Sequence, residues 1–213
     1  MSNSSSTIIS RTKPQLTIFI MSSLQNLLLS SFSLSKLQES LIIHYLSKSQ
    51  MSPLHKFIYT NSTSSLKAIS DSEDARSTIK NLRISDSNIN INTLLAQIFS
   101  SLKIAADKEF NYIIQIVLLI GENPLGEEIY HDLLTHKDVY LDIVYISESE
   151  EINELALRTL QMRLVQEHTS KCYYFKIKQD GPEIFKAMSL LTAHPQQRLV
   201  QVDIEKHLNG FKS

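Results

Sequence analysis

The chain is most apolar at residues 113–120, Ile-Ile-Gln-Ile-Val-Leu-Leu-Ile, and a second run of the same kind fills residues 16–21, Leu-Thr-Ile-Phe-Ile-Met. Both runs are short, rich in β-branched residues and apolar at odd and even positions alike. Because successive side chains of a strand point to opposite faces, such runs suit strands that are covered by helices on both sides. They predict the centre of a mostly parallel sheet.

Outward from these two runs, the sequence alternates between further strands and helices. Residues 56–59, 139–146 and 172–177 predict three more strands. Apolar residues three or four positions apart predict helices at residues 34–45, 91–102 and 152–164, and two more helices open at Asn123-Pro124 and at Gly181-Pro182. This alternation predicts a doubly wound α/β fold, a mostly parallel sheet with helices on both faces.

We expect a single domain over residues 15–192. The Ser-rich residues 1–14 are interpreted as a disordered lead-in, and residues 193–213, where the periodicity fades, as a C-terminal arm. Residues 62–92 are rich in Ser, Asn and Asp, and could hold a loop, a short strand and one polar helix near residues 74–82.

The composition excludes several kinds of function. Lys and Arg number 21 against 22 Asp and Glu, so the chain has no excess of positive charge with which to bind a polyanion, and we expect no direct nucleic-acid partner. Only 4 Gly and 1 Cys occur, which argues against Gly-rich phosphate loops and Cys-based zinc sites. No run approaches the roughly 18 apolar residues of a membrane helix. We therefore expect a cytoplasmic and nuclear protein with no membrane partner.

Candidate catalytic motifs are weak. Ser33-Leu34-Ser35-Lys36 and Ser64-Ser65-Leu66-Lys67 match Ser-x-x-Lys, but such matches arise by chance in a Ser-rich chain. His131, Asp132, His136 and Asp138 fit no zinc spacing and are interpreted as a solvated helix end. The sequence predicts that the chain is not an enzyme.

The strand ending at Met21, the helix after it, the polar crossover and the strand ending at Ile120-Gly121 together resemble a von Willebrand factor A domain. Metal-binding members carry Asp-x-Ser-x-Ser after the first strand, a Thr before the third helix and an Asp after the fourth strand, because Mg²⁺ takes hard oxygen ligands. Here the first signature reads Met-Ser-Ser-Leu-Gln over residues 21–25. The resemblance implies this fold with its metal site lost, and hence no metal and no cofactor. The positions of the degenerate site are Met21, Ser23, Gln25, Asn88, Gly121 and Glu122.

The C-terminal half resembles a narrower family. Residues 140–146 followed by an acidic helix, residues 173–176, Gly181-Pro182 and residues 191–198, Leu-Thr-Ala-His-Pro-Gln-Gln-Arg, are similar to the MERIT-forty-type scaffold subunits of the BRISC deubiquitinase and its nuclear BRCA-A counterpart. The resemblance runs from about Leu16 to Gln201 and is best in the block from Asp180 to Arg198.

That resemblance implies a non-catalytic scaffold with a role in the DNA-damage response. Its partners would be a subunit built of ubiquitin-conjugating-enzyme-like (UEV) domains and, through it, a JAMM-type deubiquitinase and its pseudo-enzyme partner. The residues it assigns to docking are His194, Pro195, Gln197 and Arg198.

General physical chemistry agrees with that assignment. Pro195 fixes φ, which lowers the entropic cost of ordering an extended segment, and Arg198 offers a planar fork to a carboxylate. The alternative is a Pro that merely ends the last helix, followed by a solvated Arg. The tankyrase-binding motif of animal members has no counterpart here, since residues 11–14, Arg-Thr-Lys-Pro, lack its acidic-Gly ending.

Two other classes of protein remain open. One is a von Willebrand-A domain that binds a ligand through a surviving metal, which Mg²⁺ would stabilise against heat. The other is an unrelated small α/β enzyme, whose turnover a Ser23→Ala or His131→Ala change would abolish.

Overall fold

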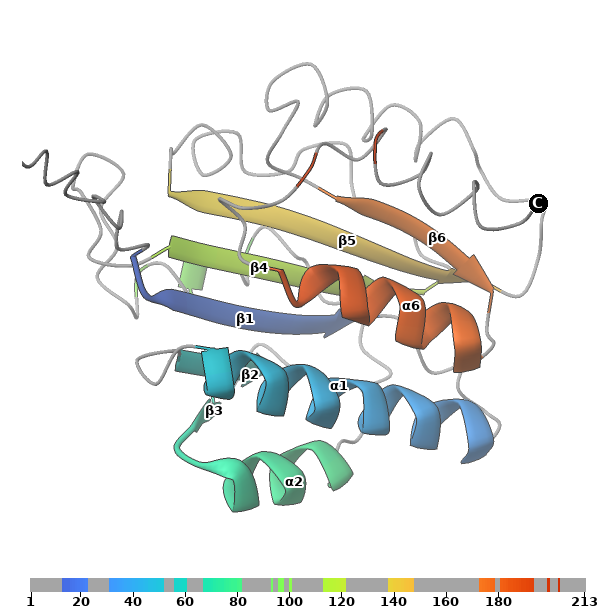
Figure 1. Cartoon of the computed structure of the whole chain (residues 1–213), viewed down its shortest axis with the longest axis horizontal. Helices are drawn as coiled ribbons and strands as arrows, with labels where there is room; N and C mark the ends of the chain where they lie inside the picture. The colour runs from blue at the N-terminus through green and yellow to red at the C-terminus, as the bar shows by residue number, and fades with distance from the viewer. Residues whose placement is uncertain are drawn as a thin grey trace, which may run out of the picture.

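The computed structural model describes residues 13–22, 31–51, 56–60, 67–81, 113–121, 138–147, 173–178 and 181–193, together with residues 93, 96, 97, 100, 199 and 203. At the centre of these residues is a six-stranded sheet in the order β3-β2-β1-β4-β5-β6 (Figure 1). Its strands are β1 Gln15–Ser22, β2 Lys56–Thr60, β3 Lys67–Ile69, β4 Ile113–Ile120, β5 Val139–Ser147 and β6 Tyr174–Lys178.

All neighbouring strands are parallel except the β2–β3 pair, which is antiparallel and leaves β3 at one edge. The order reverses between β1 and β4: β1 leads to β2 on one side, whereas β4, β5 and β6 follow on the other. Residues Gln15 to Ser22 of β1 pair in register with Ile113 to Ile120 of β4. In doubly wound folds, the crevice at such a reversal, beyond the carboxyl ends of the strands, is the usual ligand site.

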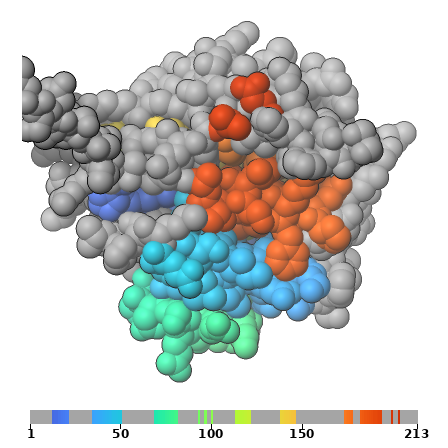
Figure 2. Space-filling model, in the orientation of Figure 1, coloured from blue at the N-terminus to red at the C-terminus, as the bar shows by residue number. Residues whose placement is uncertain are grey.

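The described residues include three helices over their whole length: α1 Ser31–Met51, α2 Ser72–Lys80 and α6 Gly181–Leu191. α1 and α6 lie side by side along the sheet, and α2 lies beside α1 at the end nearer β3 (Figures 1 and 2). Both α1 and α6 follow a strand and run back toward its amino end, so their C-termini lie at the amino edge of the sheet.

The main core lies between these helices and one face of the sheet. Strand residues such as Phe19, Val117 and Val144 meet the apolar stripes of the helices there. The opposite face is buried as well, since Ile18, Ile116 and other residues that point that way are almost fully inaccessible to solvent. The helix residues in this cluster are Leu37, Leu41, Tyr45, Ala75, Ile79, Ile184, Ala187, Met188 and Leu191.

The short polar helix α2 depends on its N-cap. Asp71 Oδ1 accepts hydrogen bonds from the backbone N–H groups of Glu73 and Asp74, both at 2.9 Å. These bonds, with that from the Asp74 N–H the largest cause, lower the pKa of the Asp71 carboxyl below its ordinary value of 3.8. The cap therefore satisfies donors that the first turn of any helix leaves unpaired.

The predicted fold class is confirmed. The strands expected at residues 16–21, 56–59, 113–120 and 139–146 are present as β1, β2, β4 and β5, and the one expected at residues 172–177 corresponds to β6 at Tyr174–Lys178. The open region 62–92 contains β3 and the polar helix α2. Residues 93, 96, 97 and 100 are helical, as expected within residues 91–102. The helices predicted at Asn123-Pro124 and at residues 152–164 fall outside the described residues.

Candidate functional site

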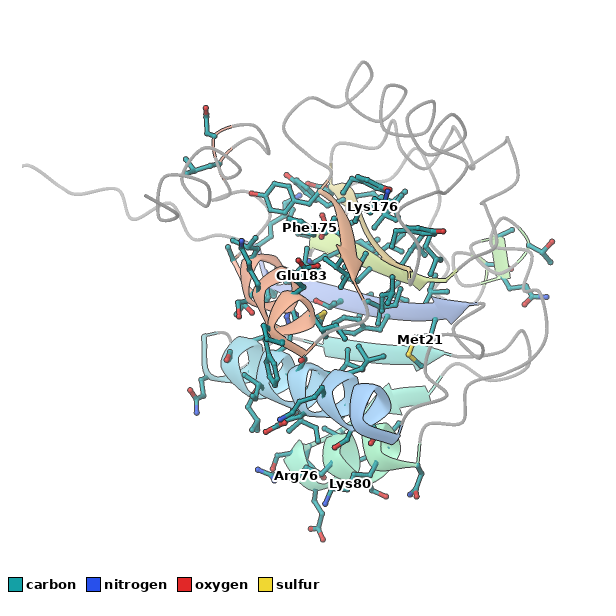
Figure 3. All side chains as sticks on the ribbon, turned by 90° about the vertical axis from the view of Figure 1, so that its right-hand side faces the viewer. Met21, Arg76, Lys80, Phe175, Lys176 and Glu183 are labelled. Carbon is teal, nitrogen blue, oxygen red and sulfur yellow. The ribbon has the colours of Figure 1, made fainter. Side chains whose placement is uncertain are left out.

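The carboxyl edge of β1 and β4 is where the resemblance places a degenerate metal site. Met21 lies near the end of β1 on the side that faces α1, in the same apolar cluster as Leu37 and Leu41, and only 3% of its surface is exposed (Figure 3). Its register partner on β4 is Leu119, and Gly121, just after β4, is buried as well. A thioether among aliphatic side chains is not a ligand for a hard cation.

The remaining positions of this site, Ser23, Gln25, Asn88 and Glu122, lie outside the described residues. Among the residues that the structure does describe, no three His, Cys, Asp or Glu side chains gather closely enough to hold a metal ion.

A buried polar network occupies the opposite, amino edge of the sheet. It begins at Lys48, in the last turn of α1, which is only 3% exposed. Its ammonium donates to Oε1 of Gln15 at 2.8 Å and to the carbonyl oxygen of Ala193, just beyond α6, at 3.2 Å. The C-termini of α1 and α6 both carry partial negative charge, which stabilises a buried cation placed between them.

From Gln15 the network crosses the sheet. Gln15 Nε2 donates to Oε1 of Gln115 on β4, and Gln115 Nε2 donates to Oδ2 of Asp142 on β5 at 2.7 Å and to the carbonyl oxygen of Leu191 at 3.3 Å. The other carboxylate oxygen of Asp142 accepts the backbone N–H of Tyr173, just before β6, at 3.1 Å. The network therefore joins α1, α6 and the four strands β1, β4, β5 and β6.

The polar groups of this network point at one another inside the protein. Gln15, Gln115 and Asp142 are each at most 3% exposed. A buried polar group costs free energy unless it is hydrogen-bonded, so each of these side chains constrains the positions of its partners. The arrangement is suited to holding structural elements in fixed relative positions.

The network reaches both sides of the predicted docking segment. His194, Pro195, Gln197 and Arg198 lie outside the described residues, but Ala193 before them and Leu199 after them are described. Ala193 is held by Lys48, and the carbonyl oxygen of Leu199 accepts a hydrogen bond from the hydroxyl of Tyr173 at 2.6 Å.

The prediction of a solvated helix end at residues 131–138 was wrong for Asp138. Asp138, interpreted with His131, Asp132 and His136 as a solvated helix end, is only 4% exposed and lies in the turn before β5. Its carboxylate forms an ion pair with Lys13 at 2.9 Å, which compensates its burial. The three other residues lie outside the described part of the chain.

Sequence reasoning missed the network, although a signal for it was present. Thr17, Gln115 and Asp142 are polar residues inside strands that are apolar on both faces, and register places all three on the face that α1 and α6 cover. Lys48 continues the stripe of Leu37, Leu41 and Tyr45 along α1. Polar residues at positions that are expected to be buried indicate partners nearby.

Comparisons with known proteins support the fold. No model of a known protein family and no curated protein matches the chain. The chain is similar in structure to proximal thread matrix protein 1 of the mussel byssus, with a TM-score of 0.54 and 11% identity over 85% of this chain and 47% of that one. It is also similar to the D319A mutant of the PilB minor pilin from Streptococcus sanguinis, with a TM-score of 0.53 and 12% identity over 87% of this chain and 62% of that one.

The chain therefore spans about half the length of the mussel protein, whose fold is von Willebrand factor A-like. At these identities the comparisons establish a shared fold only: this chain has a doubly wound, von Willebrand factor A-like fold. Among the described helices, none has the length and apolar character needed to cross a bilayer.

Proposed function

We propose that this chain is a non-catalytic scaffold subunit of a BRISC-like or BRCA-A-like deubiquitinase complex that acts in the DNA-damage response. Residues His194, Pro195, Gln197 and Arg198 dock on a UEV-domain subunit, which connects the chain to a JAMM-type deubiquitinase and its pseudo-enzyme partner. The chain contributes shape and stability to the assembly, in the cytoplasm and the nucleus, and carries no cofactor.

The observation that carries the proposal is the contrast between the two edges of the sheet. At the carboxyl edge, where a von Willebrand-A domain holds its metal, Met21 is buried in the apolar core. At the amino edge, buried polar side chains hold the residues on either side of the segment 194–198. Both features favour a protein that binds through its C-terminal arm over one that binds through a metal.

The chemistry of the segment suits recognition by a protein. Pro195 restricts the backbone before binding, and Arg198 has five donors in a planar fork that fits a carboxylate or a pair of carbonyl oxygens. Arg is enriched among residues that dominate binding energy. The UEV-domain subunit is therefore expected to present acceptors to Arg198.

The test is affinity purification of the tagged full-length chain from its native cells, followed by identification of what is captured. A UEV-domain subunit together with a JAMM-type protease would support the proposal. Purification of the chain without either would overturn it, and so would an intrinsic turnover by the purified chain.

A binding experiment then tests the segment. Arg198→Ala should weaken the affinity for the UEV-domain subunit by about 2 kcal/mol, roughly 30-fold. The matched control is Arg76→Ala, because Arg76 is exposed on the outer side of α2, on the far side of α1 from α6 (Figure 3). If the two variants bind equally well, the docking assignment is wrong.

A further inference from the structure

The residue that precedes the segment 194–198 is fixed to α1. The ammonium of Lys48 lies 3.2 Å from the carbonyl oxygen of Ala193 and 2.8 Å from Oε1 of Gln15 on β1. One helical turn earlier, the Nδ1 atom of His44 lies 3.2 Å from the carbonyl oxygen of Met188 and 3.3 Å from the hydroxyl of Thr192. Two side chains of α1 therefore hold the end of α6.

The residue that follows the segment is fixed to the start of β6. The hydroxyl of Tyr173 donates to the carbonyl oxygen of Leu199 at 2.6 Å. Tyr173 is itself immobilised: only 1% of its surface is exposed, its N–H is bound by Asp142, and its ring packs edge-on against Phe175 at a centroid distance of 5.7 Å. Leu199 as a whole is 53% exposed, so its carbonyl oxygen is held although the residue lies at the surface.

The two attachments belong to one network. Lys48 and Tyr173 are connected inside the protein through Gln15, Gln115 and Asp142. A displacement of Ala193 or Leu199 would therefore break a hydrogen bond to Lys48 or Tyr173, two residues that are almost fully buried, which is costly.

We propose that Lys48 and Tyr173 are positioning residues that act as a clamp: they hold Ala193 and Leu199, the residues on either side of the segment 194–198, so that both flanks of this segment are fixed before the partner binds. The effect on affinity rests on the proposed function of this segment; the clamp itself does not. Fixing both ends of a short segment before binding lowers the entropy that must be lost on association, and so strengthens binding without any contact from the clamp to the partner.

Tyr173→Phe is the sharpest test, because it removes only the hydroxyl that holds Leu199. Trypsin cleaves after Arg198, at the bond that directly precedes the clamped residue, so native-state proteolysis reports the clamp without any partner. We expect Tyr173→Phe to raise the rate of cleavage at Arg198 roughly 5-fold, the effect of one neutral hydrogen bond on local opening. Lys48→Met should act in the same direction from the other end.

Two controls separate clamping from loss of global stability. Cleavage after Lys80, at the end of α2, serves as an internal reference, because global unfolding raises cleavage at both sites. Tyr174→Phe removes a hydroxyl from the neighbouring residue on the opposite face of the sheet and should leave cleavage at Arg198 unchanged. The clamp is disproved if the ratio of cleavage at Arg198 to cleavage at Lys80 is the same in Tyr173→Phe and in the parent.

Binding supplies the second readout. Tyr173→Phe should weaken the affinity for the UEV-domain subunit roughly 5-fold, and should have no further effect in a chain that already carries Arg198→Ala. If the parent does not bind this subunit at all, the proposed function fails while the cleavage ratio still decides the clamp. A third outcome is that the parent binds and Tyr173→Phe changes the cleavage ratio but not the affinity. In that case the clamp exists but does not serve docking, and the positioning role is overturned.

Discussion

Gln115 on β4 donates a hydrogen bond to Asp142 on β5 at 2.7 Å, although the strand register pairs Gln115 with Tyr140. The contact is therefore diagonal across two neighbouring strands, and the long side chain of Gln115 bridges the separation. Because Asp142 also accepts the N–H of Tyr173, a single carboxylate connects β4, β5 and the start of β6.

The first prediction concerns this carboxylate. Asp142→Asn keeps the shape of the side chain but replaces one acceptor by a donor, so that either Gln115 Nε2 or the Tyr173 N–H loses its acceptor. An unsatisfied buried donor costs about 1–3 kcal/mol, and we expect the free energy of unfolding to fall by that amount in urea titrations followed by circular dichroism.

The matched control is Glu39→Gln. Glu39 pairs with Lys36 on the surface of α1 at 3.0 Å, and exposed pairs contribute less than about 1 kcal/mol. Equal losses in the two variants would contradict the structural importance of Asp142.

The second prediction concerns Lys48. Replacing it with Met fills a similar volume but leaves Gln15 Oε1 and the carbonyl oxygen of Ala193 without this donor, which destabilises the folded chain. The same change removes a buried charge and with it the cost of desolvating that charge, which acts in the opposite direction. We expect the lost hydrogen bonds to dominate, with a loss of about 2 kcal/mol in the free energy of unfolding. Lys80→Met is the control, since Lys80 also lies in the last turn of its helix but is exposed. A Lys48→Met protein as stable as the parent would show that desolvation cancels the bonds.

Much of the fold follows from periodicity alone. The runs at residues 16–21 and 113–120 are apolar at nearly every position, so they predict strands covered on both faces at the centre of the sheet, where the structure has β1 and β4. The stripe of Leu37, Leu41 and Tyr45 likewise predicts the buried face of α1. A strand that is buried on both faces is apolar at successive positions, and this pattern can be read within one short stretch of sequence.

The polar network could not be derived in the same way. Lys48 and Ala193 are separated by 145 positions along the chain, and Gln15 and Gln115 by 100. That these groups meet depends on the strand order, the register and the direction of two helices together, whereas periodicity reports only one element at a time. The antiparallel edge strand β3, with three residues, is too short to show an alternation.

The third prediction concerns the cap of α2. The pKa of Asp71 is lowered in the folded chain, so the stabilisation by its charge is present above the ordinary value of 3.8 and is lost as the pH falls through the folded value. Asp71→Ala should lower the midpoint of thermal unfolding at neutral pH, and the difference from the parent should shrink in acid. Asp71→Asn keeps a capping oxygen without the charge, so it should lose less. A difference that stays constant with pH would exclude a contribution of the charge.

The fourth prediction concerns Tyr174. Burial, and then the charge of Tyr145, raise the pKa of Tyr174 from 10.0 to about 12. Since the raised pKa favours the neutral phenol in the folded state, the associated stability is complete below pH 10 and is lost as the pH rises toward 12. Tyr174→Phe should flatten the fall in stability over this range, measured by urea unfolding at a series of alkaline pH values. An unchanged slope would show that Tyr174 does not titrate this late.

The last prediction concerns Met21, at the position that the resemblance matches to the first Asp of metal-binding von Willebrand factor A domains. Met21 is 3% exposed in an apolar cluster, so we expect millimolar Mg²⁺ to leave the thermal midpoint of the parent unchanged, because a cation that does not bind the folded state cannot stabilise it. Met21→Asp should lower the free energy of unfolding by about 3 kcal/mol or more, since it buries a carboxyl among aliphatic side chains, and Mg²⁺ should not restore it. Met21→Leu, which conserves volume, should cost less than about 1.5 kcal/mol. A rise in the midpoint of the parent with Mg²⁺, but not with NaCl of equal ionic strength, would instead identify a working metal site at this edge of the sheet and would favour the metal-dependent ligand-binding domain over the scaffold.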